Sequence, residues 1–129
     1  KLTCDTRYTD YALLEEFLPK LQAIAAKQYV PDTKTVLKTA TEFQSMDEVP
    51  GTAALLKLVQ EAAAECNLPQ PTAKAVGGGS DSAYATAAGV PTICALGVQG
   101  ARNHTAEEFA VVDTLFSRCK LFATIMLNI

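Results

Sequence analysis

The sequence predicts an α/β protein, and three observations lead to this fold class. Residues 2–8 alternate in side-chain character, which is the period of a half-buried strand. Apolar residues recur at helical spacing over residues 14–24 and 55–66. Short strand-like runs at 72–76 and 92–96 alternate with helical stretches in the second half of the chain. That alternation is typical of a layered α/β sheet.

The first part of the chain is expected to fold as strand, helix and strand. In the first strand Asp5 and Arg7 share one face. Thr9 or Asp10 can cap a helix that runs to about residue 28. Pro19 inside this stretch predicts either a kink or a late helix start. Residues 33–43 are rich in Thr and Val, which favours a second strand.

A polar stretch ending in Pro50-Gly51 indicates a domain boundary, so residues 1–46 and 47–129 are expected to be separate units. A helical stripe follows, and residues 67–69 end it. Its apolar positions are Leu55, Val59, Ala62 and Cys66.

The second unit continues with a strand at 72–76, which Gly77-Gly78-Gly79 interrupts. Ser80-Asp81 is expected to cap a helix to residue 88, and Gly89 ends it. After the strand at 92–96, residues 97–104 form a loop. Thr105 and Glu108 have capping-box spacing, which predicts a short helical turn. Asp113 is expected to cap the last helix, whose predicted stripe is Leu115, Cys119, Phe122, Met126 and Ile129.

Composition narrows the function classes. The formal net charge is -3 and no basic stripe is visible, so nucleic acid is not an expected partner. No apolar run approaches the roughly 20 residues of a membrane span, so no membrane association is expected. The four cysteines are far apart and stand among apolar residues, as buried free thiols do. We therefore expect a reducing compartment, the cytoplasm.

The glycine run 77–79 is the first candidate site. Glycines between a strand and a helix let the backbone turn and let a ligand approach closely. The N–H groups of the following helix attract anions. A tight turn with Ser80 as a cap explains the motif equally well. The run is neither a P-loop nor a dinucleotide fingerprint, because the required spacing is absent.

His104 and Arg7 are the other two candidates. His104 is the only histidine, and it follows a strand end, where α/β sheets place their sites. A neutral imidazole there is a competent zinc ligand, although a lone histidine is more often structural. Arg7 can hold a carboxylate through two parallel hydrogen bonds. Taken alone, however, a surface ion pair with Asp5 or a neighbour is the favoured interpretation of Arg7.

Several motifs together resemble one family. They are Gly77-Gly78-Gly79-Ser80-Asp81, Gly89-Val90-Pro91, Gly97 and His104-Thr105-Ala106-Glu107-Glu108-Phe109. In this order they are similar to the C-terminal end of the co-catalytic zinc peptidases, which include glutamate carboxypeptidase, aminoacylase and succinyl-diaminopimelate desuccinylase. Asp5-Thr6-Arg7 resembles the D-x-R strand of the smaller lid, or dimerisation, domain in that family.

The resemblance implies a fold and a set of roles. Residues 1–46 would be the second half of a ferredoxin-like lid, and 47–129 the C-terminal part of the catalytic α/β domain. His104 matches the last zinc ligand, and Arg7 the arginine that binds the substrate's terminal carboxylate. Gly78, Gly79 and Ser80 match the loop against the substrate, and Asp81 matches an aspartate that orders this loop.

The resemblance also implies a reaction and its partners. The full-length enzyme would be a metallopeptidase with two zinc ions, cleaving an amide bond in a small peptide or an N-acyl amino acid, and would form a homodimer through the lid. The other metal ligands and the catalytic glutamate would lie upstream of Lys1. We therefore expect no catalytic residue, no hydrolase activity and no tight zinc site in this chain alone.

One departure affects specificity. Glutamate-specific carboxypeptidases have an arginine just before the glycine run, where this chain has Lys74-Ala75-Val76. Lys74 could substitute for that arginine, but strand alternation could also direct it elsewhere. A preference for a glutamate side chain is therefore not predicted, whereas Arg7 still supports a free terminal carboxylate on the substrate.

Two other function classes stay open. One is a dimerisation or assembly module derived from the family, which intact upstream ligands would exclude. The other is a glycine-loop domain that binds anions without a metal, for which replacing His104 would leave activity unchanged.

Overall fold

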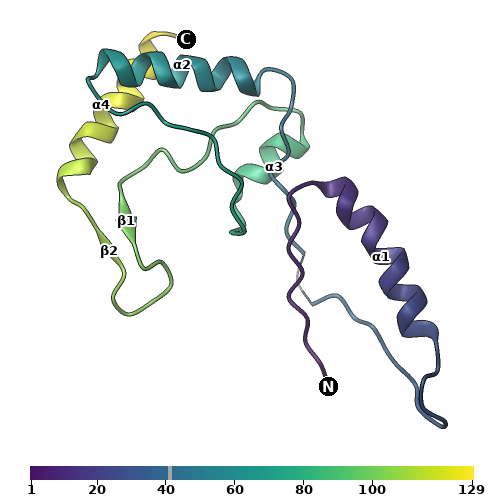
Figure 1. The fold of residues 1–129 in the computed structure, drawn as a ribbon. Helices are drawn as coiled ribbons and strands as arrows, with labels where there is room; N and C mark the ends of the chain where they lie inside the picture. Colours follow the sequence, from purple (N-terminus) through teal and green to yellow (C-terminus); the bar gives the residue numbers. More distant parts are fainter. Residues whose placement is uncertain (41) are drawn as a thin grey trace. The chain divides into compact units, whose positions relative to one another are not determined.

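The computed structural model describes residues 1–40 and 42–129 (Figure 1). The chain forms two compact units, Lys1–Glu48 with Ala75–Val90 and Val49–Lys74 with Pro91–Ile129. Helices joined to one small sheet agree with the α/β class at a coarse level. In the described part of the chain, no helix is both long and apolar enough to cross a membrane. The elements are α1 (Tyr11–Ala26), α2 (Thr52–Glu65), α3 (Ser82–Ala87), β1 (Gly100–Ala101), β2 (Phe109–Ala110) and α4 (Asp113–Leu127).

Four predicted strands are wrong as hydrogen-bonded strands. Residues 2–8, 72–76 and 92–96 belong to no sheet, nor do the described residues of 33–43; Thr41 lies outside the described residues. Within the described chain the sheet consists of β1 and β2 alone. Alternating or apolar residues predict an extended backbone, but a strand also needs a neighbour that pairs with its N–H and C=O groups. Figure 1 draws the segment before α1 as a thin trace with no strand arrow.

Helix α1 begins where its cap predicts. The Asp10 carboxylate accepts a hydrogen bond from the backbone N–H of Ala12 at 2.8 Å. This satisfies one of the N–H groups that the first turn leaves without a helical partner. The helix continues through Pro19 to Ala26, so a late start is wrong. Leu14 is its buried residue.

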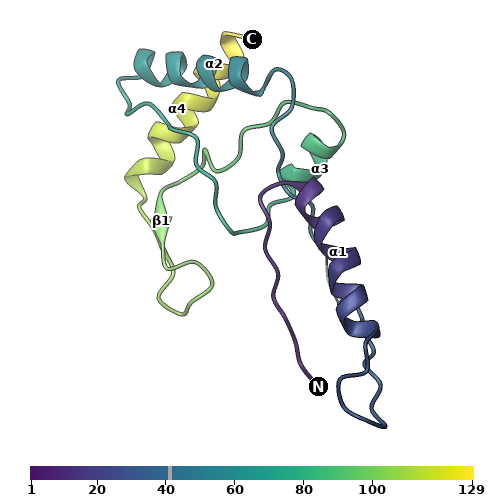
Figure 2. The same cartoon turned by 45° about the vertical axis from the view of Figure 1, so that its right-hand side comes forward.

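The core of the second unit forms where α2 packs on α4, and Figures 1 and 2 both show these helices crossing. Helix α2 ends at Glu65 with Cys66 as its C-cap, just before the predicted stop at residues 67–69. Asn67 has φ 57°, its N–H bonds to the Ala64 carbonyl, and the Leu68 N–H bonds to the Ala63 carbonyl. This is the pattern of a Schellman cap. The cap returns Leu68 onto the core, whose buried members are Val59, Ala62, Ala63, Leu121 and Ile125.

The predicted stripe of α4 is wrong as a core face. Leu121 and Ile125 are the buried residues, whereas Phe122 and Met126 are exposed. Apolar residues lie on more than one side of this helix, so their spacing fits several faces, and packing against α2 selects one of them. The helix begins at Asp113 with Val112 at the capping position, so Asp113 lies in the first turn instead of capping it.

The cysteines also differ from expectation. Only Cys66 is buried, and its Sγ lies 3.2 Å from Thr124 Oγ1. Cys4, Cys94 and Cys119 are exposed. Apolar neighbours in sequence predict burial only when the local element packs against a core.

Candidate functional site

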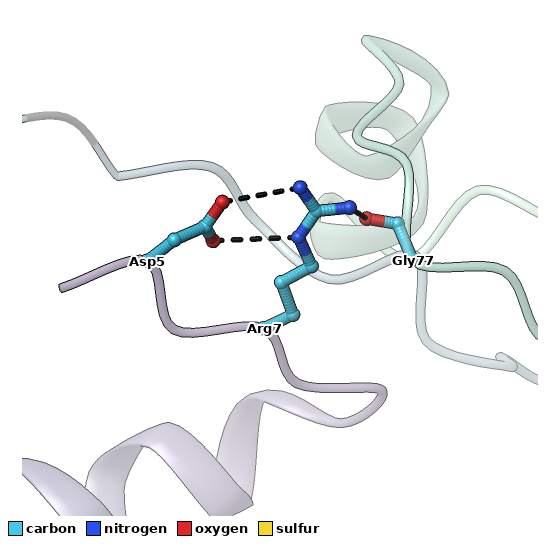
Figure 3. Close-up of polar contacts among 3 residues, drawn as sticks. All are labelled: Asp5, Arg7 and Gly77. Carbon is cyan, nitrogen blue, oxygen red and sulfur yellow. Dashed lines mark hydrogen bonds and ion pairs between the residues drawn. The ribbon is translucent and has the colours of Figure 1, made fainter.

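Arg7 pairs with Asp5 along one edge of its guanidinium group (Figure 3). Arg7 Nε lies 3.3 Å from Asp5 Oδ1, and Nη2 lies 3.1 Å from Oδ2. Both side chains are largely exposed, so water and salt screen the pair. The surface ion pair that Arg7 suggested on its own is therefore confirmed.

Arg7 also contacts the glycine run from 70 positions away in sequence. Its Nη1 donates a hydrogen bond of 3.0 Å to the carbonyl oxygen of Gly77 (Figure 3). Two of the three candidate sites thus meet in the first unit. Beside this contact is a hollow of about 550 Å³, lined by Arg7 and Gly77 together with apolar side chains such as Leu13, Phe17 and Val76. A cation at the edge of an apolar hollow is typical of a site for a small organic anion.

The ion pair shifts the pKa of both Asp5 and Arg7. The hydrogen bond from Arg7, and then its positive charge, lowers the pKa of Asp5 below its ordinary value of 3.8. The same hydrogen bond and charge from Asp5 raise the pKa of Arg7. Both groups are therefore ionised at neutral pH, as carboxylate recognition by Arg7 requires.

Neither a left-handed backbone nor a steric clash requires glycine at the three positions of the run. The glycines with a left-handed φ are Gly51 and Gly89, and neither of them belongs to the run 77–79. A Cβ on Gly77 would lie 3.5 Å from the Arg7 side chain, and one on Gly79 would lie 3.5 Å from the Phe43 ring. A Cβ on Gly78 would meet nothing within 4 Å. The run therefore presents bare backbone beside Arg7, which favours its use as a ligand-contact loop.

The start of α3 contains both the cap and the loop-ordering candidate. Ser80 Oγ accepts a hydrogen bond of 3.2 Å from the Ser82 N–H, so the turn with a Ser80 cap is present. Asp81 stands at the capping position but makes no side-chain capping bond in α3. Its loop-ordering role stays a prediction. Gly89 ends the helix with φ 81°, as predicted.

His104 lies in the turn of a hairpin. Strands β1 and β2 pair antiparallel, with Gly100 opposite Ala110 (Figure 1). The predicted loop 97–104 therefore contains β1. The helical turn predicted from Thr105 is present only as a single turn, in which the Glu108 N–H bonds to the Thr105 carbonyl, and it completes the hairpin turn without forming a helix. Thr105 Oγ1 donates to the Arg102 carbonyl at 2.8 Å and accepts from the Glu107 N–H at 3.3 Å.

Arg102 and His104 both have a left-handed backbone in this turn. Arg102 has φ 60°, a value that is strained for a residue other than glycine, and His104 has φ 66°, a value that His adopts more often than most residues. The Glu108 carboxylate accepts a hydrogen bond from the His104 N–H at 3.3 Å. The capping-box spacing predicts that it would accept from the N–H of the next residue, Thr105. Strain such as that at Arg102 often accompanies functional loops. The imidazole is exposed at the end of this hairpin and is available to a ligand.

The described residues do not form a metal site by themselves. Among them, no three His, Cys, Asp or Glu side chains are grouped so as to hold a metal ion. A catalytic zinc needs about three protein ligands. His104 belongs to the second unit and Arg7 to the first. The chain thus contributes one candidate ligand, and no reaction step through a metal follows from these residues.

Two supporting residues were not predicted. The Tyr8 hydroxyl donates to the Phe43 carbonyl, and the Phe43 ring lies against Gly79. Burial, followed by the negative charge of Glu42, raises the pKa of Tyr8, so its hydroxyl stays a donor. The strand alternation placed Tyr8 on the face opposite Arg7, but it could not identify a partner 35 residues away.

Comparison with protein families decides the wider assignment. Residues 15–128 match the model of peptidase family M20/M25/M40. The chain belongs to this family. Its members are peptidases, which are hydrolases, and they are typically metal-dependent. The resemblance is confirmed at this level, while the particular group of zinc peptidases is not decided by the match. Arg7 precedes the matched residues, and neither the curated proteins nor the solved structures gave a match.

Proposed function

We propose that this chain is part of a zinc-dependent exopeptidase or N-acyl amino acid amidohydrolase whose substrate carries a free carboxylate. The observation that supports this most is the contact between Arg7 and Gly77 in a member of a peptidase family. It joins a permanently charged, carboxylate-binding side chain to a loop with bare backbone. Neither feature alone distinguishes a peptidase from other anion-binding proteins.

Each residue has one proposed role. Arg7 binds the substrate carboxylate, and the backbone of Gly78, Gly79 and Ser80 lies along the substrate. His104 supplies one zinc ligand through a neutral imidazole nitrogen. Zinc, when bound, polarises the scissile carbonyl and makes a bound water nucleophilic. Residues outside this chain would complete the metal site and provide the general base.

The remaining parts of the proposal concern organisation. Residues 1–46 would belong to a lid that also forms a homodimer, and residues 47–129 to the catalytic domain. The protein would act in the cytoplasm on small peptides or N-acyl amino acids, without nucleic acid or membrane partners. Asp81 would order the substrate loop. The alternative is an assembly module of the same family that has lost catalysis.

Replacement of His104 tests the metal role. In the zinc-loaded protein that contains this chain, His104→Ala is expected to lower the hydrolysis rate by about three orders of magnitude, because a lost ligand displaces the metal that activates water. Asn103→Ala, in the same hairpin turn, is the control and should retain activity. Zinc content is measured for each variant. An unchanged rate in His104→Ala with full zinc content would exclude this role and favour metal-free anion binding.

The chain alone is expected to lack hydrolase activity and to lose zinc on dialysis against a weak chelator, since a single histidine holds the ion poorly. Retention of one zinc per chain after such dialysis would contradict this expectation.

A further inference from the structure

We propose that Asp5 is a positioning residue, which orients Arg7 so that the guanidinium presents a preformed fork to the substrate carboxylate. This inference rests on the proposed role of Arg7 in carboxylate binding. It adds a second residue to the carboxylate site and makes Asp5 responsible for part of the affinity.

The geometry of the pair leaves one edge of the guanidinium open. Asp5 takes Nε and Nη2, which form one edge of the planar group, and the Gly77 carbonyl takes one N–H of Nη1. A guanidinium has five N–H groups in fixed directions. These contacts engage three of them and leave one N–H on each Nη nitrogen. Those two form a second fork that matches a carboxylate.

Two contacts on different sides fix the plane of this group. Asp5 lies two residues away in the same segment, whereas Gly77 belongs to the glycine run (Figure 3). An arginine held this way needs no further ordering when the ligand arrives, and ordering a long side chain weakens binding. Arg7 and Gly77 also line the apolar hollow of the first unit.

The opposite role for Asp5 is competition, in which its carboxylate occupies the place of the ligand. The open edge argues against competition, because a ligand can bind without displacing Asp5. The positive guanidinium lies between the two carboxylates and offsets their repulsion. The two roles predict effects of opposite sign, so one titration separates them.

The test is binding of N-acetylglycine to the 129-residue chain at 0.15 M salt, followed by NMR, with N-acetylglycinamide as the uncharged control ligand. Asp5→Asn is expected to weaken binding roughly two- to tenfold, the usual effect of ordering one long side chain. Asp32→Asn, in the turn after α1, removes the same charge elsewhere and should leave affinity unchanged. In the Arg7→Lys background Asp5→Asn should no longer weaken binding, because an ammonium has no fork to orient.

A spectroscopic measurement supports the titration. The Arg7 Nε–H should exchange slowly with water in the wild-type chain and faster in Asp5→Asn. If Arg7→Gln leaves N-acetylglycine binding unchanged, or the wild type does not bind it, the carboxylate role of Arg7 fails and this inference fails with it. If Arg7→Gln abolishes binding while Asp5→Asn leaves it equal or tighter, only the positioning role is overturned.

Discussion

At the residue scale, the candidate site depends on one long-range hydrogen bond. Arg7 reaches Gly77, and the Phe43 ring covers Gly79 on the other side of Gly78. The glycine between them has open space, so bare backbone is accessible at that position. Exposed ion pairs contribute little to stability. The pair of Asp5 and Arg7 is therefore expected to orient the guanidinium and fix its charge, and to contribute little to the free energy of folding.

The pKa of Asp5 provides a direct check of the ion pair. It should lie below 3.8 in the wild-type chain and rise toward that value in Arg7→Gln, because the hydrogen bond and the charge of Arg7 are then lost. The folded-state pKa is depressed, so the pair is intact above its ordinary value and is lost as pH falls through the lowered one. Carboxyl-carbon NMR measures the titration.

Glu16 serves as the internal control for this experiment. Its pKa is lowered by a separate hydrogen bond and charge, from Lys20, and should not respond to Arg7→Gln. An Asp5 pKa that is equal in the wild type and Arg7→Gln would show that the pair does not form in solution.

Gly78→Ala tests whether a ligand approaches the backbone of the glycine run, because this substitution is expected to change binding without changing stability. The added Cβ has open space, so the urea unfolding midpoint should stay within the range of a neutral surface change. Binding of N-acetylglycine should nevertheless weaken several-fold, because a methyl group stands where the ligand approaches. Equal affinity in the two proteins would show that the ligand does not use this backbone.

At the element scale, the sequence predicted helices well and strands poorly. Helices satisfy their own backbone, so Asp10, Asn67 and Gly89 indicate their ends locally. Strands need a partner, and neither the alternation at residues 2–8 nor the apolar run at 92–96 identifies one. For the same reason the sequence predicted His104 and Arg7 as single candidates, but not the contact of Arg7 with Gly77 or the support from Phe43.

Pro50-Gly51 predicted a turn before α2, but it did not predict that the position of Gly51 excludes a Cβ. It precedes α2 with φ 97°, and a Cβ would lie 2.8 Å from the Pro91 ring. Gly51→Ala should therefore destabilise the second unit by about 1–3 kcal/mol, combining left-handed strain with the clash. Urea unfolding measures the change. Gly97→Ala, which meets nothing within 4 Å, is the control. Equal stability of both variants would mean that the turn rearranges freely.

At the scale of the whole molecule, the core is small and many large apolar side chains are exposed. In the described residues eight apolar side chains are buried. On α4 alone, Phe116 is 72% exposed and Met126 is 69% exposed. Apolar surface of this extent favours association with another surface.

We therefore expect the 129-residue chain to self-associate at micromolar concentrations, as sedimentation velocity would show. Phe116→Lys with Met126→Lys should shift the distribution toward monomer, because both side chains are exposed and a charge opposes apolar contact. Leu2→Lys, at an exposed apolar position on another segment, is the matched control. A monodisperse wild-type monomer across a concentration series would be inconsistent with this expectation.

The proposed function depends on recognition of a substrate carboxylate by Arg7. The most direct test compares hydrolysis of N-acyl amino acids and their C-terminal amides by the zinc-loaded protein that contains this chain. We predict that the wild type prefers the free acid, and that Arg7→Gln lowers kcat/KM for the acid by about 10- to 100-fold while leaving the amide unchanged. An equal loss for acid and amide, or no loss for either, would contradict this role of Arg7.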